Sequence, residues 1–195
     1  DQYFGTLDGT SDFFAPSMVQ LNGRNMEHEW RDNPDYYYTD SITDYALKFL
    51  READEEQPFY LYLSFNAAHW PLHAKPDDIA HYEGRYEMGW DALREQRHAR
   101  MKTLGVVDLA WKLSPRNEEV DAWEETENLD WQQRRMEVYA AQVTCMDRNI
   151  GRVIDAIKAA GKYDNTIIIY HHDNGGCHVE YDPDRTGDWT REFTT

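Results

Sequence analysis

The chain has 195 residues, enough for a single domain with a substantial hydrophobic core. Its 37 acidic residues outnumber its 20 lysines and arginines, so the formal charge is −17. A field of this sign repels nucleic acids and anionic membranes and attracts cations, so we expect no nucleic-acid partner. No apolar run reaches the roughly 18 to 20 residues of a membrane-spanning helix, and the N-terminus lacks the pattern of a signal peptide. Two cysteines, Cys145 and Cys177, allow at most one internal disulfide and leave the redox compartment undecided.

The first third of the chain predicts a loop, a helix and a buried strand. Residues 1–38 mix glycine, proline and aromatic residues without sustained periodicity, which indicates irregular structure packed by aromatics. The segment DSITDYALKFLREA (40–53) has apolar residues at helical spacing, with Thr39 or Asp40 as the expected N-cap. The run FYLYLSF (59–65) has strand length and is apolar on both faces, as in a central strand of a covered sheet.

The rest of the chain predicts a long connection followed by a second helix and strand. Residues 66–128 are mostly polar, with a helix near 90–104, and an excursion of this length suggests a functional role. The segment from 131 carries one apolar stripe and stops at Gly161 as a C-cap. It leads into NTIIIYHH (165–172), which is typical of a buried parallel strand.

Two units of helix and buried strand predict an α/β sheet with helices on its faces. In such sheets ligands bind beyond the carboxyl ends of the strands. The first strand runs into Asn66, His69, His73 and Lys75, and the second into the cluster HHDNGGCH (171–178). If the two strands are parallel in one sheet, both polar clusters lie at the same edge.

Asp173 and Asn174 are the candidate metal ligands of the second cluster. A carboxylate and an amide carbonyl are hard oxygen ligands suited to Ca²⁺ or Mg²⁺, and Gly175 and Gly176 permit positive φ and close backbone approach. The alternative is an ordinary turn, because Asn-Gly and Gly-Gly are common in turns without a metal. Adjacent strand residues point to opposite faces, which disfavours a zinc site built from the neighbouring His171 and His172 together with Cys177 and His178. The acids of DPDRTGDWTRE (182–192) lack the full spacing of a calcium loop and suggest surface connection.

His69 is the candidate acid or hydrogen-bond donor of the first cluster. A histidine held between a strand end and Pro71 could donate to an oxyanion or protonate a leaving group. The alternative is a structural histidine packed near aromatic residues. Lys75 is also consistent with a solvated surface charge. We assign no role to His81 and His98.

Several segments, in this order, resemble the formylglycine-dependent arylsulfatases of the alkaline-phosphatase-like superfamily. They are PFYLYLSFNAAHWPLHA, then HYEGRYEMGWDALREQRHARMKTLGVVD and WKLSP, and last YAAQVTCMDRNIGRVIDAIKAAGKYDNTIIIYHHDNGG. The opening DQYFGTLDGTSDFFAPS is similar to the segment that follows the Lys-and-His motif of the family. The resemblance covers almost the whole chain.

The resemblance implies an alkaline-phosphatase-like α/β sheet with helices on both faces, incomplete in this chain, and hydrolysis of sulfate esters. It implies that Asp173 and Asn174 bind the divalent ion, usually Ca²⁺ with Mg²⁺ or Mn²⁺ as alternatives. It also implies that His69 contacts the sulfate and assists departure of the leaving group. The substrate would be a small sulfate ester or a sulfated glycan, and the location periplasmic or extracellular. The oligomeric state stays open.

The chain departs from the family pattern at the nucleophile. The family oxidises a Cys or Ser in a Cys/Ser-x-Pro-x-Arg motif to formylglycine, and this sequence contains no such motif. We therefore expect an internal fragment in which 1–195 is part of a sulfatase catalytic domain, 66–128 is an excursion between two core strands, and formylglycine lies in a missing N-terminal part. Such a fragment alone should have no turnover. The alternatives are a phosphodiesterase or phosphonate hydrolase of the same superfamily, and a degenerate cation-binding module without activity.

Overall fold

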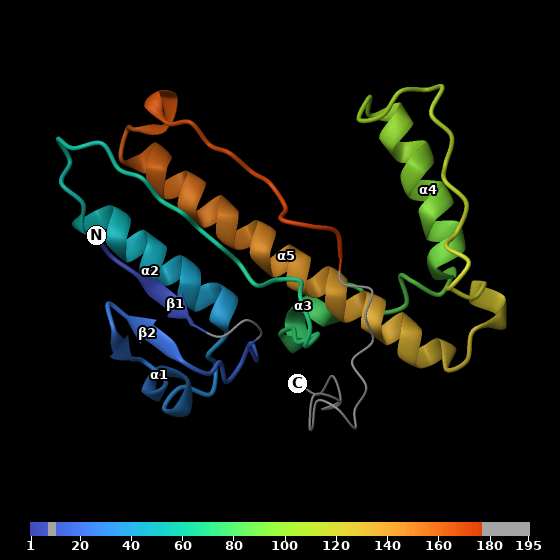
Figure 1. The fold of residues 1–195 in the computed structure, drawn as a ribbon, viewed down its shortest axis with the longest axis horizontal. Helices are drawn as coiled ribbons and strands as arrows, with labels where there is room; N and C mark the ends of the chain where they lie inside the picture. The colour runs from blue at the N-terminus through green and yellow to red at the C-terminus, as the bar shows by residue number, and fades with distance from the viewer. Residues whose placement is uncertain (8–10, 177–195) are drawn as a thin grey trace.

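The computed structural model describes residues 1–7 and 11–176. Predictions for Cys177, His178 and 182–192 lie outside these residues. The described chain is a mixture of helices and short strands around two long helices (Figure 1). In chain order the elements are β1 (Phe4–Thr6), β2 (Val19–Leu21), β3 (Arg24–Asn25), α1 (His28–Arg31), α2 (Tyr38–Glu52), α3 (Pro76–Ala80), α4 (Gly89–Thr103), η1 (Trp123–Glu125), α5 (Leu129–Ala159) and η2 (Tyr163–Asn165).

A small antiparallel sheet occupies the N-terminal region, where the sequence predicted only irregular loop. The strand order is β1-β2-β3, and Phe4 pairs with Leu21. Asn22 and Gly23 connect β2 and β3 with φ values of 50° and 84°. Positive φ at both positions of a two-residue Asn-Gly loop is the type I′ hairpin turn, which follows the natural twist of the strands. The prediction was wrong because strands of two or three residues are too short to display a period of 2.

The two predicted long helices are confirmed as α2 and α5, which pack against each other (Figure 1). Ala46 of α2 forms a buried cluster with Val153 and Ile157 of α5. The N-cap of α2 is Tyr37, so the predicted caps Thr39 and Asp40 lie inside the helix. At the end of α5, Gly161 has a φ of 67° and its backbone N–H bonds to Lys158. This left-handed glycine ends the helix as predicted.

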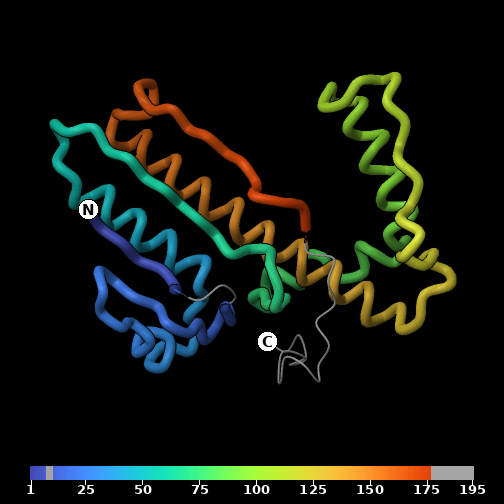
Figure 2. The backbone as a smooth tube through the Cα atoms, viewed as in Figure 1, coloured from blue at the N-terminus to red at the C-terminus, as the bar shows by residue number. Residues whose placement is uncertain are grey.

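The two predicted strands, 59–65 and 165–172, are not hydrogen-bonded strands in the structure. Both segments run along the α2/α5 pair in the same direction (Figure 2). The first alternates half-buried and exposed side chains, and Leu61 and Leu63 pack against the α2/α5 cluster. Within the described chain no backbone hydrogen bond joins residues 59–65 or 167–172 to a neighbouring strand. A β-ladder forms only when the backbone N–H and C=O groups of two neighbouring strands bond to each other, and these segments have no such neighbour among the described residues.

The predicted helix near 90–104 is confirmed as α4, which stands apart from the α2/α5 pair (Figure 1). Its base is built on Gly89, which has a φ of 72° and lies directly against the Trp123 ring of η1. The Trp90 and Trp123 rings meet edge to face with centroids 4.7 Å apart. In the part of the chain that the structure describes, no helix is both long and apolar enough to cross a membrane.

Candidate functional site

The ends of the two extended segments open into one shared hollow. Its volume is about 1230 Å³, and its walls are β1, α2, the first segment, Tyr170 and His172 at the end of the second segment, and the side of α5 that carries Tyr139, Val143 and Met146. His69 from the first segment and Asp173 and Asn174 from the second all line it. The expectation that both polar clusters meet at one edge is therefore compatible with the structure, although no paired sheet among residues 1–7 and 11–176 holds them there.

His69 is exposed and sits in a turn directly after the first segment. Its backbone N–H donates to the Asn66 carbonyl at 2.8 Å. Its ring Nδ1 lies 2.9 Å from the Trp70 carbonyl oxygen. Because a carbonyl oxygen only accepts, Nδ1 must carry the hydrogen in this contact. The other ring nitrogen, Nε2, is then the atom that can exchange a proton with a ligand.

Asp173 and Asn174 are exposed at the mouth of the hollow. The Asn174 backbone N–H donates to Asp173 Oδ1 at 3.0 Å, and the second carboxylate oxygen and the Asn174 side-chain oxygen are the atoms that could coordinate a cation. Gly175 and Gly176 do not use the positive φ that the sequence suggested. Tyr139 lies close enough to Gly176 that an added Cβ would be 3.4 Å from its hydroxyl oxygen. Gly176 thus lies beside Tyr139 of α5.

The described residues supply the right type of metal donor but too few of them. Ca²⁺ takes about 6 to 8 oxygen ligands, and Asp173 and Asn174 supply a minority of that number. Residues 1–7 and 11–176 contain no group of three or more His, Cys, Asp or Glu side chains placed to share an ion. His172 Nε2 lies 3.0 Å from the Tyr170 hydroxyl. A complete ion site thus requires ligands outside the described residues.

His73 and Lys75, two other predicted rim residues, are half-buried and face acidic side chains. The His73 Nδ1 lies 3.5 Å from Asp12 Oδ1, beside the rings of Phe13 and Phe14. The Lys75 ammonium is 2.6 Å from Asp40 Oδ2. Lys75 is therefore not the solvated surface charge that the sequence allowed.

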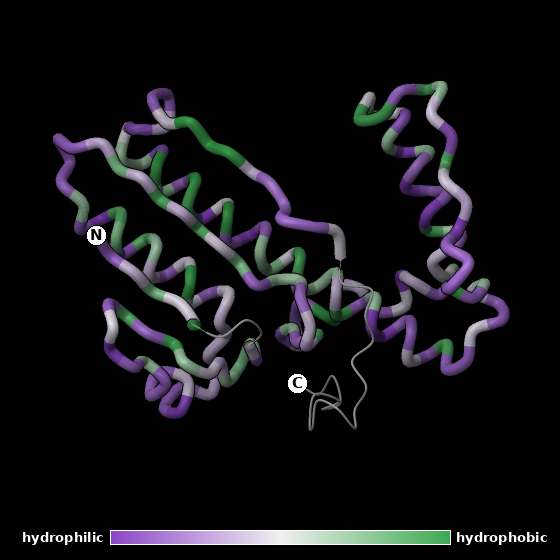
Figure 3. The backbone as a smooth tube through the Cα atoms, in the orientation of Figure 1, coloured by the Kyte–Doolittle hydropathy of each residue, from purple (hydrophilic) through white to green (hydrophobic). Residues whose placement is uncertain are grey.

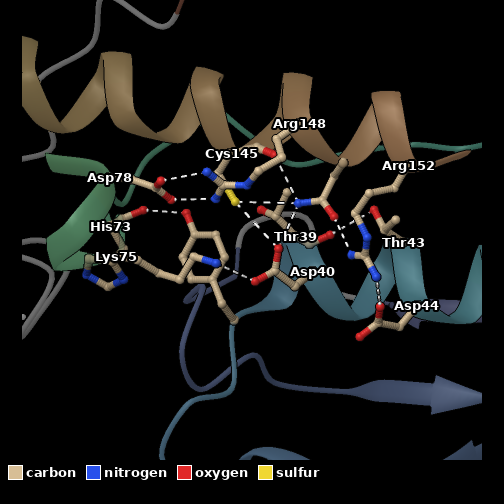
Figure 4. Close-up of polar contacts among 12 residues, drawn as sticks. Thr39, Asp40, Thr43, Asp44, His73, Lys75, Asp78, Cys145, Arg148 and Arg152 are labelled. Carbon is tan, nitrogen blue, oxygen red and sulfur yellow. Dashed lines mark hydrogen bonds and ion pairs between the residues drawn. The ribbon is translucent and has the colours of Figure 1, made fainter. Parts of the chain in front are cut away.

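A polar network centred on Asp40 joins α2, α5 and the segment after His69 (Figure 4). Asp40 Oδ1 accepts a hydrogen bond from Asn149 Nδ2 at 2.7 Å, while Oδ2 faces Lys75. Burial acts to raise the pKa of Asp40, but the bonds from Lys75 and Asn149 outweigh it and hold the pKa below its usual value. The Cys145 thiol lies 3.6 Å from the same carboxylate, and burial raises its pKa to about 11. Cys145 is thus a structural residue and not a nucleophile.

A second ion pair fixes α3 to α5 in the same region. Arg148 donates two parallel hydrogen bonds of 2.8 Å to the buried carboxylate of Asp78 (Figure 4). The fully buried Gln142 also donates to the Pro71 carbonyl at 3.4 Å. Together these contacts hold the turn that carries His69 against α5. Sequence reasoning missed them, although Gln142 and Asn149, polar residues on the buried side of α5, were a readable signal.

Comparison with known proteins gives the family. The chain matches the family Sulfatase over residues 1–192. It is 36% identical to an uncharacterized sulfatase of Schizosaccharomyces pombe, with 88% of this chain and 31% of that protein covered. It is 32% identical to the arylsulfatase of Klebsiella aerogenes, with 72% of this chain and 31% of that protein covered. The chain belongs to the sulfatase family, and it spans about a third of the length of these two relatives.

A solved structure supports the fold. The crystal structure of Ps i-CgsB in complex with k-i-k-neocarrahexaose aligns with a TM-score of 0.52 and 21% identity, over 85% of this chain and 30% of that chain. The predicted α/β class is therefore confirmed, and the chain fits a partial domain of the expected alkaline-phosphatase-like type.

Proposed function

We propose that these residues form part of the catalytic domain of a sulfuric ester hydrolase that acts on sulfated glycans or small sulfate esters. The observation that carries the proposal is that His69 lines one hollow with the adjacent pair Asp173 and Asn174, which lie 104 and 105 positions further along the chain. Family membership supports sulfate-ester chemistry. A glycan ligand is supported by the neocarrahexaose bound to Ps i-CgsB and by the similarity to an N-acetylglucosamine-6-O-sulfatase of Bacteroides thetaiotaomicron.

His69 is assigned the role of proton donor to the leaving group. When the sulfur–oxygen bond to the alcohol breaks, the departing oxygen gains negative charge and takes a proton from Nε2 of a His69 ring that is protonated on both nitrogens, which leaves the ring neutral with its hydrogen on Nδ1. The bond from Nδ1 to the Trp70 carbonyl sets the ring orientation for this transfer. The nucleophile lies outside this sequence, which contains no Cys/Ser-x-Pro-x-Arg motif. The 195 residues alone are therefore proposed to have no turnover.

Asp173 and Asn174 are assigned as two oxygen ligands of a divalent ion, with Ca²⁺ preferred and Mg²⁺ or Mn²⁺ as alternatives. A bound ion of this kind supplies positive charge for the sulfate oxygens. The formal charge of −17 also favours accumulation of cations around the chain. The remaining ligands and formylglycine are proposed to come from polypeptide outside the described residues.

The test compares His69→Ala with His81→Ala in a polypeptide that carries these residues together with the nucleophile motif. His81 is the matched control, because it is exposed and its Nδ1 also contacts a carbonyl oxygen, that of Asp77, but it does not line the hollow. We expect kcat on an aryl sulfate to fall about 10²- to 10⁴-fold for His69→Ala and to be unchanged for His81→Ala. Equal effects of the two substitutions would reject the assignment of His69.

Substrate choice separates the proposed activity from its alternatives. The same polypeptide is assayed on matched aryl sulfate, phosphate and phosphonate esters. Preference for the sulfate supports the proposal, whereas preference for a phosphate or phosphonate ester assigns the other hydrolase class of the superfamily. No hydrolysis of any ester, with Ca²⁺ bound, would identify a cation-binding module without catalysis.

A further inference from the structure

The outer end of α4 and the chain that follows it form a basic region in an acidic protein. Residues 96–116 contain five lysines and arginines and a single acidic residue, Asp108, so their formal charge is +4. The whole chain carries −17, so the remaining residues together carry −21. The five cations are Arg97, Arg100, Lys102, Lys112 and Arg116. Acidic residues are thus nearly absent from one region of a chain that is rich in them elsewhere.

This basic region is the free end of an arm, residues 89–116, which stands apart from the α2/α5 pair (Figure 1). The chain turns back at Gly105, which has a φ of 70°. It then returns beside α4, where Arg94 donates a hydrogen bond to the Ser114 carbonyl at 3.0 Å. Lys112 lies between the turn and Ser114, so it runs beside the outer half of the helix and adds its charge to the charges there.

The cations at the free end of the arm have no acidic partner within the described chain. Arg97, Arg100 and Lys112 are exposed, and Lys102 is half-buried. Among the residues that the structure describes, no ion pair includes any of these four side chains. Their positive charges are therefore not neutralised by the part of the chain that is described.

The spacing of the cations brings like charges together. Side chains three and four positions apart are neighbours on a helix surface, and like charges at this spacing destabilise the helix. The four positions at this spacing from Arg97 are Leu93, Arg94, Arg100 and Met101. Two of them are positive and none is acidic. The helix C-terminus attracts Arg100 and Lys102 in the last turn, but Arg97 lies further from the end. An anion bound from solvent would offset this repulsion.

Exposed apolar side chains lie beside the cations. Trp111 is 63% exposed and directly precedes Lys112, and the side chains of Leu104, Val106 and Leu109 are more than half exposed. Figure 3 shows hydrophobic residues at the free end of the arm, next to the hydrophilic helix. Exposed apolar groups gathered in this way mark a surface that binds a ligand. Because an indole ring packs against the C–H face of a sugar, the combination favours an anionic sugar polymer.

We propose that the outer half of the arm, with Arg97, Arg100, Lys112 and Trp111, binds the sulfate groups and sugar rings of a sulfated polysaccharide. A guanidinium group can donate two parallel hydrogen bonds to an oxyanion such as sulfate, and it keeps its charge at physiological pH. None of the four residues lines the hollow that contains His69. The site is thus separate from the proposed catalytic site.

The arm stands on the side of the molecule toward which both extended segments run (Figures 1 and 2). A polymer with one sulfate ester in the hollow would therefore hold further sulfate groups near the arm. The choice of a glycan as ligand rests on the proposed sulfatase function, whereas the positive charge of the arm does not. The site would favour polymeric sulfate esters over small ones as substrates.

A nucleic acid is a poorer ligand for this site. At physiological ionic strength charges are screened beyond about 8 Å, so an arm that stands apart keeps a positive potential of its own. A nucleic acid strand carries a negative charge about every 3.4 Å, and it would extend from the arm onto the acidic remainder of the chain. A sulfated glycan carries neutral groups between its sulfates and meets less repulsion there.

The binding test uses the 195-residue chain and a neocarrahexaose that carries a neutral dye, followed by fluorescence anisotropy. We expect a Kd below about 1 mM. The double variant Arg97→Gln, Arg100→Gln should weaken binding about tenfold or more, because it loses charge-assisted hydrogen bonds while glutamine maintains the helix. The control Arg24→Gln, Arg51→Gln removes the same charge from two exposed arginines outside the arm and should change Kd less than about twofold. Equal effects of the two double variants, or no binding by the wild type, would overturn the proposal.

Three further measurements test the class of ligand. The desulfated hexaose should bind much more weakly, and equal binding would show that sulfate is not recognised. A single-stranded DNA of matched length should also bind more weakly, and tighter binding would assign the arm to nucleic acid. Trp111→Ala should weaken binding of the sulfated hexaose, and an unchanged Kd would remove the sugar contact. A dimer in sedimentation that dissociates in the Arg97→Gln, Arg100→Gln variant would identify a second copy of the chain as the ligand. Each of these contrary results overturns the proposal.

Activity measurements distinguish failure of this site from failure of the proposed function. In the longer polypeptide of the His69 test, the Arg97→Gln, Arg100→Gln variant should raise KM for the hexaose about tenfold relative to KM for an aryl sulfate. An equal change for both substrates would mean that the arginines act on the fold, and would overturn the proposal. If neither substrate is hydrolysed but the hexaose still binds through the arm, the proposed function fails and the anion site stands.

Discussion

Replacing Asp40 with alanine tests whether the buried polar network holds α2, α5 and the turn after His69 together. The substitution removes the acceptor of the Asn149 bond at 2.7 Å and of the Lys75 bond at 2.6 Å. A hydrogen bond to a charged group contributes about 1.5 to 3 kcal/mol. The pair with Lys75 is about 30% exposed on both side chains, so solvent screening reduces its share to about 1 kcal/mol or less. Asn149 keeps its bond to the Cys145 carbonyl, and the net loss is expected to be about 2 to 3 kcal/mol.

Asp44→Ala is the control, because Asp44 lies one turn further along α2. Its carboxylate contacts Arg152 at 2.5 Å but is 60% exposed, so the loss should be about 0.5 kcal/mol. The assay is urea unfolding of the wild type and both variants at pH 7, followed by tryptophan fluorescence. Free energies of unfolding for Asp40→Ala and Asp44→Ala that agree within about 0.5 kcal/mol would refute the reasoning.

The contribution of Asp40 to the free energy of unfolding should also depend on pH. The pKa of Asp40 in the folded chain is held below its unfolded value, so the unfolded state binds the proton more readily. The stability that Asp40 contributes is then present above the ordinary aspartate pKa and is lost as the pH falls through the lower folded value. The difference between the wild type and Asp40→Ala should therefore shrink when the unfolding is repeated at about pH 3. A constant difference would contradict the ionic part of the explanation.

Three further predictions concern other parts of the fold. Burial acts to raise the pKa of Asp12, but the His73 imidazole and two backbone N–H donors lower it to about 2. The wild type should therefore lose stability as the pH falls from about 4 to about 2, and Asp12→Asn should lose less over the same range, as measured by unfolding at a series of acidic pH values. Gly89→Ala places a Cβ 2.1 Å from the Trp123 ring at a φ of 72° and should loosen the base of α4, seen as faster hydrogen exchange there but not in α2. Cys145 is buried and the pKa of its thiol is raised to about 11, so at pH 7 a thiol reagent should modify it only when the chain unfolds. The measurement uses the Cys177→Ser variant, and rapid modification of its folded form would contradict the burial of Cys145.

The parts of the fold that sequence reasoning predicted are those with a local cause. The helices α2, α4 and α5 start and stop within about two residues of their predicted limits, because a 3.6-residue apolar period and a terminal glycine act within a few turns of the chain. The sheet β1-β2-β3 was missed because its only local signal is the Asn22-Gly23 turn. The two expected strands form extended segments, but their pairing depends on a neighbour that local sequence does not reveal.

The sequence by itself determined the helices, the family, and the choice of His69, Asp173 and Asn174 as candidate site residues, since each rests on motifs of a few contiguous residues in a fixed order. Only the tertiary structure decided that these residues line one hollow and that Lys75 is half-buried in an ion pair with Asp40. Asp40 bonds to partners 35 and 109 positions away in the chain, and no pattern of nearby residues encodes such a contact. Whether 59–65 and 167–172 have paired neighbours among the described residues is likewise a tertiary property, because a strand edge is free or covered only in relation to what lies beside it in space.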